Sequence, residues 1–511
     1  MRNKVNWRKL IFIFAAIFFI FVIFLPAVFI LSNILHGGAI LNWQIFKAVL
    51  ISFFIGLVVL LIDLAFGLPL AWVLARSRSK MARLVDSLID LSLVMPTAAL
   101  GLSVYLYWGE KIGLARLFGL KEGLFDKGIM MIILLHVVFT IPYIIRSISA
   151  AIRQIEDSYT EAAVTLGAYP FTSFRTISLP LFRDGIINGS ILAFTRSLSE
   201  TGATMMVAGL VSTAPVLAVN LKNAGELPQA IGLSMILIAS AIFILIGAKA
   251  MLGQKTINLD HVYPRLEKRI GKLTIPRNLM IGLFFIFVIF LPTIFIILYS
   301  FGNWEAVFSE TIIKSIIISF AVAFVVTVIN LIFALPLAYM IARSKSFFGK
   351  LFDSMNEIVL LVPTSALGIS LVLFWSNFLS FEYIILILTH LCFSFPLLLK
   401  PLVVAFRDIP LDLEEAAHSL GANSKQVLKT ILFPLVIPAI IAGSIMAFMR
   451  SLSETGATLA VSSQIQTVPV LIVNLVQDAK FGQAAFISTL LFAVALLFLL
   501  ILKYFTYRKN H

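Results

Sequence analysis

The nine residues RSLSETGAT occur twice in this chain of 511 residues, at Arg196–Thr204 and again at Arg450–Thr458. Both copies stand inside long apolar stretches, and each holds an arginine and a glutamate four residues apart. On an α-helix this spacing places the two charges on one face, one turn apart. The duplicated pair indicates a membrane protein built from two copies of one unit.

The composition supports a membrane location. Hydrophobic residues make up 60% of the chain and charged residues 13%, which is more apolar than a soluble protein of this size can bury. Apolar runs of about 20 residues, each about 30 Å long as a helix, recur along the sequence. Because a backbone in lipid must satisfy its own hydrogen bonds, these runs predict an all-α polytopic membrane protein. The lone cysteine, Cys392, lies in such a run and is expected to be a small buried side chain.

The apolar runs predict about twelve transmembrane helices. We place them near residues 10–32, 46–75, 87–108, 128–149, 185–208, 231–250, 278–300, 311–342, 355–375, 383–405, 437–461 and 485–503. The N-terminus, the even-numbered loops and the C-terminus hold 29 Lys and Arg residues, whereas the odd-numbered loops hold 8. The positive-inside rule therefore puts both termini in the cytoplasm. The net charge of +14 follows from this topology and needs no nucleic-acid partner.

The internal repeat extends well beyond the nine residues. GLPLAWVLARSR at Gly67–Arg78 matches ALPLAYMIARSK at Ala334–Lys345, 267 positions later, whereas matches beyond residue 130 are 254 positions apart. The first copy therefore has 13 additional residues, which we place in the outer loop near 109–127. We expect a first repeat over 1–252, a cytoplasmic linker over 253–277 and a second repeat over 278–511. Six spans in each repeat make the copies parallel, with a central path between them.

A duplicated cytoplasmic loop joins the fourth and fifth spans of each repeat. Its copies are SYTEAAVTLG from Ser158 and DLEEAAHSLG from Asp412. The residues that match are Glu161, Ala162, Ala163 and Gly167 in the first copy, and Glu415, Ala416, Ala417 and Gly421 in the second. Ser158 and Asp412 are predicted to cap a short helix, with the glutamate three residues later completing a capping box. The glycines are predicted to end the helix in the left-handed conformation.

These loops resemble the EAA loop of the permeases of bacterial and archaeal ABC importers, in which EAA is followed by Gly and then by an I-x-LP segment. The second copy departs from this pattern at Phe433. The resemblance covers nearly the whole chain, as two fused permease units of the type I importer fold in the cell membrane. It implies two separate ATP-binding subunits docked on the two loops and an extracytoplasmic solute-binding protein. The chain has no G-x-x-x-x-G-K-[ST] segment, so ATP hydrolysis is expected in those subunits.

The charged pair lies deep in the predicted fifth and eleventh spans. Arg196 and Arg450 are about 18–20 Å from the cytoplasmic side, where an isolated charge costs at least about 2.5–3.5 kcal/mol. One interpretation is that the segments line a polar translocation path. The candidate path residues are Arg196, Glu200, Thr201, Arg450, Glu454 and Thr455. The alternative is a structural ion pair that fixes helix register.

Two resemblances bear on the substrate. RSLSETGAT resembles the R-A-L-G-E-x-G-A segment of sulfate and molybdate permeases, with Ser199 and Ser453 where glycine is common. The fused length resembles the permeases for ferric iron, thiamine or aminoethylphosphonate. We expect a small solute, with an inorganic oxyanion favoured by the paired arginines and ferric iron or thiamine as alternatives.

Other functions remain open on the sequence alone. A secondary transporter of the twelve-span class would show a G-x-x-x-D-R-x-G-R-R-like loop after the second span, and RSRSKMARLVD does not fit it. A non-transporting membrane scaffold is a further alternative. An integral membrane enzyme would need clustered nucleophiles or metal ligands, and none is evident. We therefore expect no catalytic, cofactor-binding or metal-binding residues.

Overall fold

The computed structural model describes residues 7–36, 42–77, 79–251, 273–301, 309–344, 347–462 and 464–507, and every regular element in these ranges is helical. The prediction of an all-α fold is confirmed. Of the predicted linker, residues 253–272 lie outside the described ranges. The rest of it already belongs to the second repeat, because α16 begins at Thr274.

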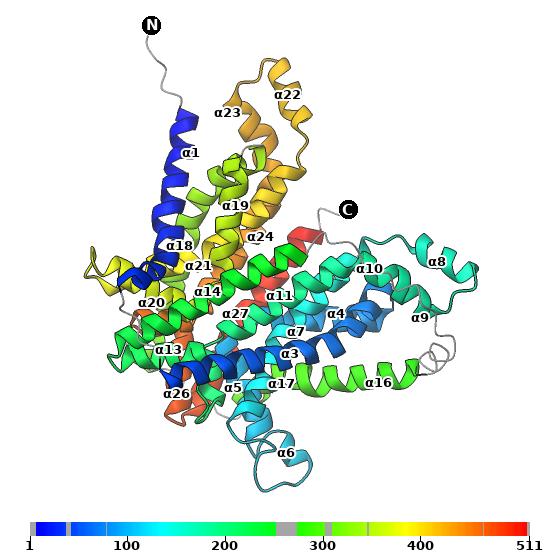
Figure 1. The fold of residues 1–511 in the computed structure, drawn as a ribbon, viewed down its shortest axis with the longest axis vertical. Coiled ribbons are helices and arrows are strands. Elements are labelled where there is room, and N and C mark those ends of the chain that lie inside the picture. The colour runs from blue at the N-terminus through cyan, green and yellow to red at the C-terminus, as the bar shows by residue number, and fades with distance from the viewer. Residues whose placement is uncertain are drawn as a thin grey trace.

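The first repeat contains the elements α1 to α14 (Figure 1). In chain order they are α1 (Trp7–Phe18), the π-helical η1 (Phe19–Phe24), α2 (Leu25–Val28), the 3-10 helix η2 (Phe29–His36), α3 (Trp43–Arg76), α4 (Lys80–Val94), α5 (Thr97–Val104), η3 (Tyr105–Gly109), α6 (Leu114–Leu117), α7 (Ile129–Arg153), α8 (Asp157–Thr165), α9 (Pro170–Ser173), η4 (Phe174–Ser178), α10 (Leu179–Leu181), α11 (Arg183–Ser199), α12 (Gly202–Val207), α13 (Ala214–Asn223) and α14 (Leu227–Met251).

The second repeat follows the same order, and among its described residues η2, η3, α6 and α10 have no counterpart. Its elements are α16 (Thr274–Phe284), η5 (Phe285–Phe290), α17 (Leu291–Ser300), α18 (Glu310–Arg343), α19 (Phe347–Leu361), α20 (Thr364–Trp375), α21 (Glu382–Asp408), α22 (Leu411–Ser419), α23 (Ser424–Val427), η7 (Leu428–Leu432), α24 (Phe433–Leu452), α25 (Gly456–Val461), α26 (Val468–Gln477) and α27 (Phe481–Tyr507). The short helix α6 projects from the end of the molecule opposite α22 (Figure 1). It falls in the region where we placed the additional residues of the first repeat.

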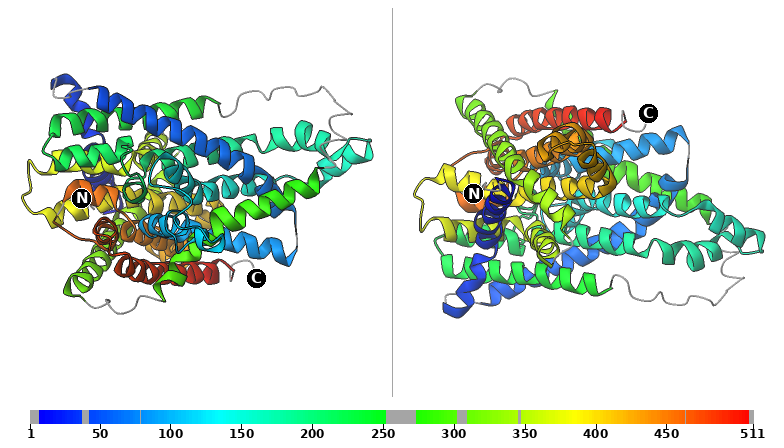
Figure 2. Two further views of the ribbon diagram at one scale, coloured as in Figure 1. Left: turned by 90° about the horizontal axis from the view of Figure 1, so that it is seen from below. Right: turned by 90° about the horizontal axis from the view of Figure 1, so that it is seen from above.

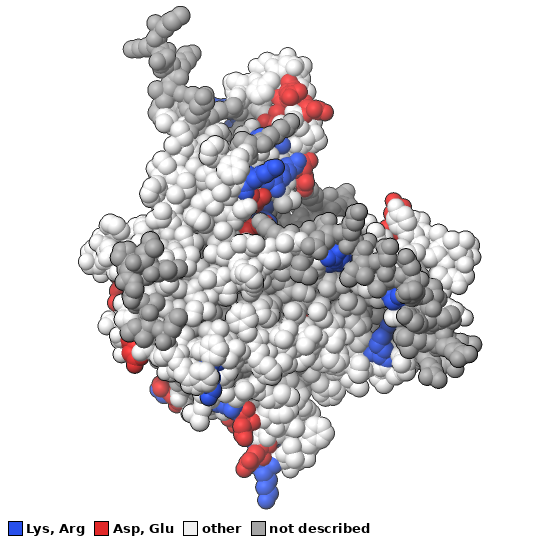
Figure 3. All heavy atoms as spheres, viewed as in Figure 1, with Lys and Arg blue, Asp and Glu red and all other residues white. Residues whose placement is uncertain are grey.

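Within the described ranges, nine helices are long and apolar enough to cross a membrane, and two bent pairs raise the number to eleven. The chain is therefore a multi-pass membrane protein. The face shown in Figure 3 is mostly uncharged, and its Lys, Arg, Asp and Glu side chains gather mainly near the loops at its margins. About twelve transmembrane helices were predicted, and the difference comes from helices that bend or break.

The predicted third and ninth spans are not single straight helices. The pair α4 and α5 is bent by 106°, and the pair α19 and α20 by 110°. Pro96 and Pro363 stand at the N-caps of α5 and α20. Proline drives the residue before it out of the helical region, and Met95 accordingly ends α4 with ψ of 131°. The bend at each proline is therefore a sharp corner rather than a mild kink.

The first helix of each repeat packs against the other repeat. Phe18 of α1 stacks on Phe333 of α18 with ring centroids 3.7 Å apart. In the same way, Phe284 of α16 stacks on Phe66 of α3 at 3.8 Å. Figure 2 shows α1, in dark blue, beside the yellow helices of the second repeat. This exchange makes each repeat depend on the other for its packing.

A buried serine fastens each exchanged helix. The hydroxyl of Ser370 donates to the carbonyl oxygen of Pro26 at 2.7 Å and accepts from the backbone N–H of Ile30 at 3.1 Å. These two groups would bond to each other in a regular α-helix, so the hydroxyl is inserted into the helix ladder. Ser103 makes the same insertion into α17, at 2.5 and 3.0 Å. In lipid, where water is absent, the hydroxyls supply the missing partners.

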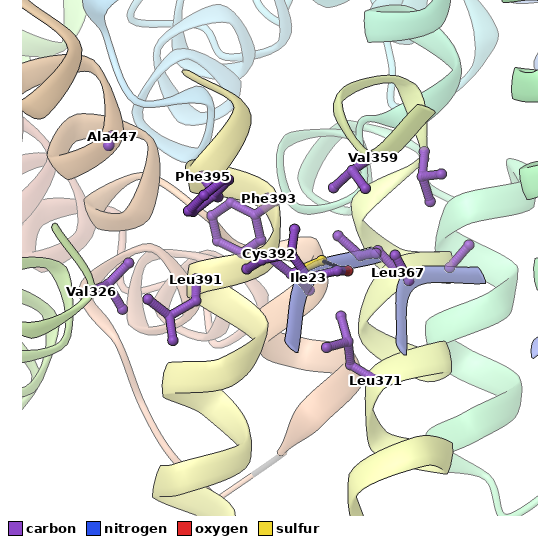
Figure 4. Packing of buried hydrophobic residues seen from close by; sticks show 14 of the residues in the cluster. Ile23, Val326, Val359, Leu367, Leu371, Leu391, Cys392, Phe393, Phe395 and Ala447 are labelled. Carbon is purple, nitrogen blue, oxygen red and sulfur yellow. Dashed lines mark hydrogen bonds between the residues drawn. The ribbon is translucent and has the colours of Figure 1, made fainter. Parts of the chain in front are cut away.

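Cys392 lies where the exchanged helix meets the second repeat. Its side chain is buried, as predicted, and its thiol donates to the carbonyl oxygen of Ile23 at 3.1 Å. Figure 4 shows the sulfur pointing at this oxygen, with Leu367 and Leu371 of α20 near by. With the two bonds of Ser370 to α2 and η2, this bond to η1 makes a third polar link between the exchanged segment and the second repeat.

Removal of the inserted hydroxyls tests the exchange. Ser103→Ala and Ser370→Ala should each lower the free energy of unfolding by about 1–3 kcal/mol, because two buried backbone groups lose their partner. Thermal unfolding in detergent measures the effect. Ser240→Ala is the matched control, since that hydroxyl bonds to Leu237 of its own helix. Equal unfolding temperatures for all three variants would contradict the exchange.

Candidate translocation site

The two RSLSETGAT segments are breaks in helices. Glu200 is extended, with ψ of 128°, and separates α11 from α12. In the second repeat, residues 453–455 separate α24 from α25. The spans predicted at 185–208 and 437–461 are therefore each divided into two helices, and the break that Gly202 was expected to permit is present. Each glutamate starts the helix that follows it, because Glu200 Oε1 accepts from Ala203 N–H at 3.1 Å and Glu454 Oε1 accepts from Ala457 N–H at 2.9 Å.

The predicted ion pairs are present in both repeats. Arg196 Nη2 lies 2.8 Å from Glu200 Oε2, and Arg450 Nη1 lies 2.6 Å from Glu454 Oε2. The two glutamate side chains are 4% and 3% exposed, whereas the arginine side chains are 18% and 23% exposed. The glutamate side chains are thus almost fully buried, whereas the arginine side chains keep partial exposure.

The breaks of the two repeats meet each other. A Cβ atom built on Gly202 would lie 2.4 Å from Thr455 Cγ2, and one on Gly456 would lie 2.7 Å from Thr201 Oγ1. Both distances are too short for any side chain, so glycine is required at each position. Thr201 and Thr455 are buried, with 1% and 3% of their surface exposed. The structure therefore brings all six predicted path residues to one place between the repeats.

The helices that follow the sharp corners, α5 and α20, pack closely against the helices that follow the breaks, α12 and α25. A Cβ atom on Gly101 of α5 would lie 2.9 Å from Ala203 Cα, and one on Gly368 of α20 would lie 2.8 Å from the carbonyl oxygen of Ala457. The hydroxyl of Thr364, the first residue of α20, hydrogen-bonds to Glu454. The duplicated PTAALG and PTSALG segments therefore serve close packing as well as bending, which the sequence reading missed.

Two histidines also belong to the site. The sequence showed them only as matching positions of the two repeats. His136 of α7 contacts Ser197 Oγ through Nδ1 at 2.8 Å and Thr204 Oγ1 through Nε2 at 3.0 Å. The copy in α21, His390, makes the same contacts with Ser451 and Thr458 at 2.8 and 3.0 Å. The signal that could have identified them is their match in register, combined with their burial in apolar sequence.

An aromatic ring lies beneath each arginine. The guanidinium carbon of Arg196 is 5.3 Å from the ring centre of Phe139, and that of Arg450 is 5.1 Å from the ring centre of Phe393. A cation over a ring face is attracted by the ring quadrupole. The arginines are therefore held by a carboxylate and a ring.

The two EAA loops are short helices with glycine stops, as predicted. Gly167 and Gly421 have φ of 90° and 85°. The N–H of the next residue bonds to the carbonyl five residues before it at 3.0 Å in both loops, which is a Schellman motif. The predicted N-caps are wrong, because α8 and α22 begin one residue before Ser158 and Asp412. The N-cap positions are Glu156 and Pro410 without side-chain caps, so no capping box forms.

Both loops project from the ends of the helices that carry them, far from each other (Figure 1). Four residues of the motif are exposed, namely Glu161, Ala162, Glu415 and Ala416. Ala163 is buried and Ala417 is half-buried. Leu166 and Leu420, just before the glycines, are 88% and 90% exposed. The second helix is tied to its repeat by Arg343 Nε, which donates to Glu414 Oε1 at 2.8 Å. Each loop thus presents a firm surface with an exposed leucine.

Among the described residues, no three His, Cys, Asp or Glu side chains are grouped so that they could hold a metal ion. The polar groups of the site are instead hydroxyls, carboxylates and guanidinium groups. This set suits the passage of a polar solute.

Comparison with known proteins identifies a family. Residues 67–257 and 334–509 each match the family described as binding-protein-dependent transport system inner membrane component. The molybdenum transport system permease protein ModB of Mycobacterium tuberculosis is 34% identical over 197 residues, which cover 37% of this chain and 74% of ModB. The molybdate/tungstate transport system permease protein WtpB of Methanocaldococcus jannaschii is 29% identical over 241 residues, covering 46% of this chain and 93% of WtpB. The sulfate transport system permease protein CysT of Escherichia coli is 31% identical over 222 residues, covering 41% and 77%.

The contact between the breaks can be tested through its glycines. Gly202→Ala and Gly456→Ala should each lower the free energy of unfolding by about 1–3 kcal/mol, because the new methyl group would overlap a threonine of the other repeat. Gly247→Ala is the control, since a Cβ atom there meets nothing within 4 Å. Equal unfolding temperatures for the three variants would rule out the contact.

Proposed function

The chain belongs to the family of binding-protein-dependent transport system inner membrane components, and from this premise we propose that it forms the path of an ABC importer for a small tetrahedral oxyanion of the molybdate, tungstate or sulfate kind. The relatives named above are permeases for these anions. Each aligns with less than half of this chain. The proposal treats the chain as a fused pair of such permeases. Family membership also favours a transport permease over a secondary transporter, a scaffold or an enzyme.

One observation carries the proposed substrate class. The side chains of Arg196 and Arg450 keep partial exposure, while those of their glutamate partners stay buried. A solute that enters between the repeats would therefore meet positive charge before negative charge. Guanidinium groups offer planar hydrogen-bond donors that suit oxyanions. Ferric iron and thiamine carry positive charge, so the same two arginines would repel them.

The energy source and partners follow from the two EAA loops. We propose that each loop docks one ATP-binding subunit and that both termini and both loops lie in the cytoplasm. An extracytoplasmic binding protein would deliver the anion on the opposite side. The exposed surfaces of α8 and α22 support the first part, because little of their outward face is used within the chain.

The competing interpretation of the charged pairs is purely structural. An Arg–Glu pair that only fixes helix register could be replaced by neutral hydrogen-bonding residues of similar shape with little loss. A pair that attracts an anion could not. The two interpretations therefore differ in what they predict for substitutions that remove both charges together.

Neutralisation of the arginines should abolish transport. In proteoliposomes that hold the complete transporter with ATP, Arg196→Gln with Arg450→Gln should reduce uptake of radiolabelled molybdate or sulfate to the background. A second variant adds Glu200→Gln and Glu454→Gln, so that no buried carboxylate is left unpaired. It should remain inactive, because attraction for the anion is still missing.

The control is Arg116→Gln, which changes an exposed arginine near α6. It should transport like the wild type. Full uptake by the variant without any of the four charges would refute the path role and leave the structural interpretation. Uptake of ferric iron or thiamine in preference to the oxyanions would refute the substrate class.

The docking surface can be tested at its exposed leucines. Leu166→Asp with Leu420→Asp should weaken co-purification of the ATP-binding subunits at least about tenfold, because a charge replaces an apolar contact of about 1.5 kcal/mol or more. Folding should be unaffected, since both side chains are exposed. Leu117→Asp, at an equally open position in α6, is the control. Unchanged recovery of the ATP-binding subunits with the double variant would exclude these loops as the docking site.

A further inference from the structure

Each buried histidine bridges the break in its repeat. Ser197 belongs to α11, before the break, and Thr204 belongs to α12, after it. The imidazole of His136 contacts both hydroxyls at once. Thr204 in turn donates to the carbonyl oxygen of Glu200, the residue at the break, at 3.2 Å. The ring therefore fixes the two short helices relative to each other and to α7.

The second repeat has the same bridge with the same atoms. His390 contacts Ser451 of α24 and Thr458 of α25, and Thr458 donates to the carbonyl oxygen of Glu454 at 3.3 Å. Two copies that agree within about 0.1 Å in each corresponding distance indicate a functional arrangement of both rings. Neither histidine has an ion-pair partner among the described residues.

The helices that carry the histidines lead directly to the docking loops. α7 is continuous from Ile129 to Arg153, about 37 Å, and three residues separate it from α8. α21 ends at Asp408, and two residues separate it from α22. Pro142 in α7, and Pro396 and Pro401 in α21, lie between the histidine and the loop, so the helices can bend there. Both helices are nevertheless unbroken, and an unbroken helix transmits part of a displacement from one end to the other. A movement imposed on an EAA loop therefore reaches a histidine.

Ion pairs stiffen the cytoplasmic parts of the same helices. Arg146 of α7 contacts Asp86 and Asp90 of α4 at 2.6 and 2.5 Å. Lys400 of α21 contacts Glu357 of α19 at 2.6 Å. These ion pairs thus hold α7 to α4 and α21 to α19, the helices that lead into the sharp corners beside the breaks. The long helix and the corner must move together.

We propose that His136 and His390 are positioning residues that convert movement of the EAA loops into separation of the two helix breaks. This inference rests on the proposed function and adds the residues that couple ATP hydrolysis to the gate. Each imidazole moves with its long helix and carries both hydroxyls with it. Without the ring, the loop and the long helix would move while the break stayed closed.

The experiment measures the number of anions transported for each ATP hydrolysed by the complete transporter in proteoliposomes. His136→Ala with His390→Ala should continue to hydrolyse ATP, and the ratio should fall at least about tenfold, because two hydrogen bonds are lost in each repeat. His136→Asn with His390→Asn keeps an amide oxygen near the position of Nδ1, where it can accept from the serine hydroxyl, and should give an intermediate ratio. A ratio no higher than that of the alanine variant would contradict a role for the hydrogen bonds.

The control is Thr389→Ala, which removes a buried hydroxyl next to His390 that bonds to the backbone of its own helix. A purely structural role for the histidines would lower the yield of folded protein and leave the ratio unchanged. If the alanine variant does not accumulate, Ser197→Ala with Ser451→Ala removes the same contacts from the other side and should lower the ratio. A wild-type ratio in either double variant overturns the inference. Absence of ATP-driven uptake by the wild type would instead refute the proposed function, and the inference with it.

Discussion

The contact between Gly202 and Thr455, and its copy between Gly456 and Thr201, is the constraint around which the molecule is arranged. A helix that breaks within a membrane leaves backbone groups without partners, and lipid offers none. Here the glutamate of each break accepts from the helix that follows it. The buried carboxylate in turn needs a cation, which the arginine one turn earlier supplies. The glycines then allow the two breaks to approach, so that each one covers the other.

The exchange of the first helices makes this contact a property of both repeats together. α1 packs on the second repeat and α16 on the first, each fastened by a serine inserted into its ladder. Separation of the repeats would expose these serines as well as the breaks. Movement at the centre must therefore occur as a change in angle between interlocked halves. The two EAA loops lie at the ends of these halves, where a small rotation produces the largest displacement.

Much of this arrangement could be predicted from the sequence, because it follows from local chemistry. Apolar runs of membrane length fixed the helical class, and the i, i+4 spacing of Arg196 and Glu200 fixed the ion pair. Gly167 could be placed in the left-handed conformation because few other residues adopt it. The failures concern tertiary contacts. The glycine after Glu200 made a break conceivable, but nothing in a single sequence shows that the carboxylate will cap the next helix. The role of His136 could not be predicted because its partners lie 61 and 68 positions further along the chain.

The central claim is that the two breaks touch in the resting protein and part during transport. The most direct measurement is disulfide formation between Thr201→Cys and Thr455→Cys in a Cys392→Ala background, which leaves no other thiol in the chain. Each threonine packs against the glycine beside the other, since a Cβ atom on Gly456 would lie 2.9 Å from Thr201 Cβ and one on Gly202 would lie 2.5 Å from Thr455 Cβ. This pair therefore places both thiols at the contact and keeps both glycines. The account predicts rapid cross-linking without nucleotide and little cross-linking when the complete transporter is trapped with ATP and vanadate. Equal cross-linking in both states, or none in the resting state, would contradict it.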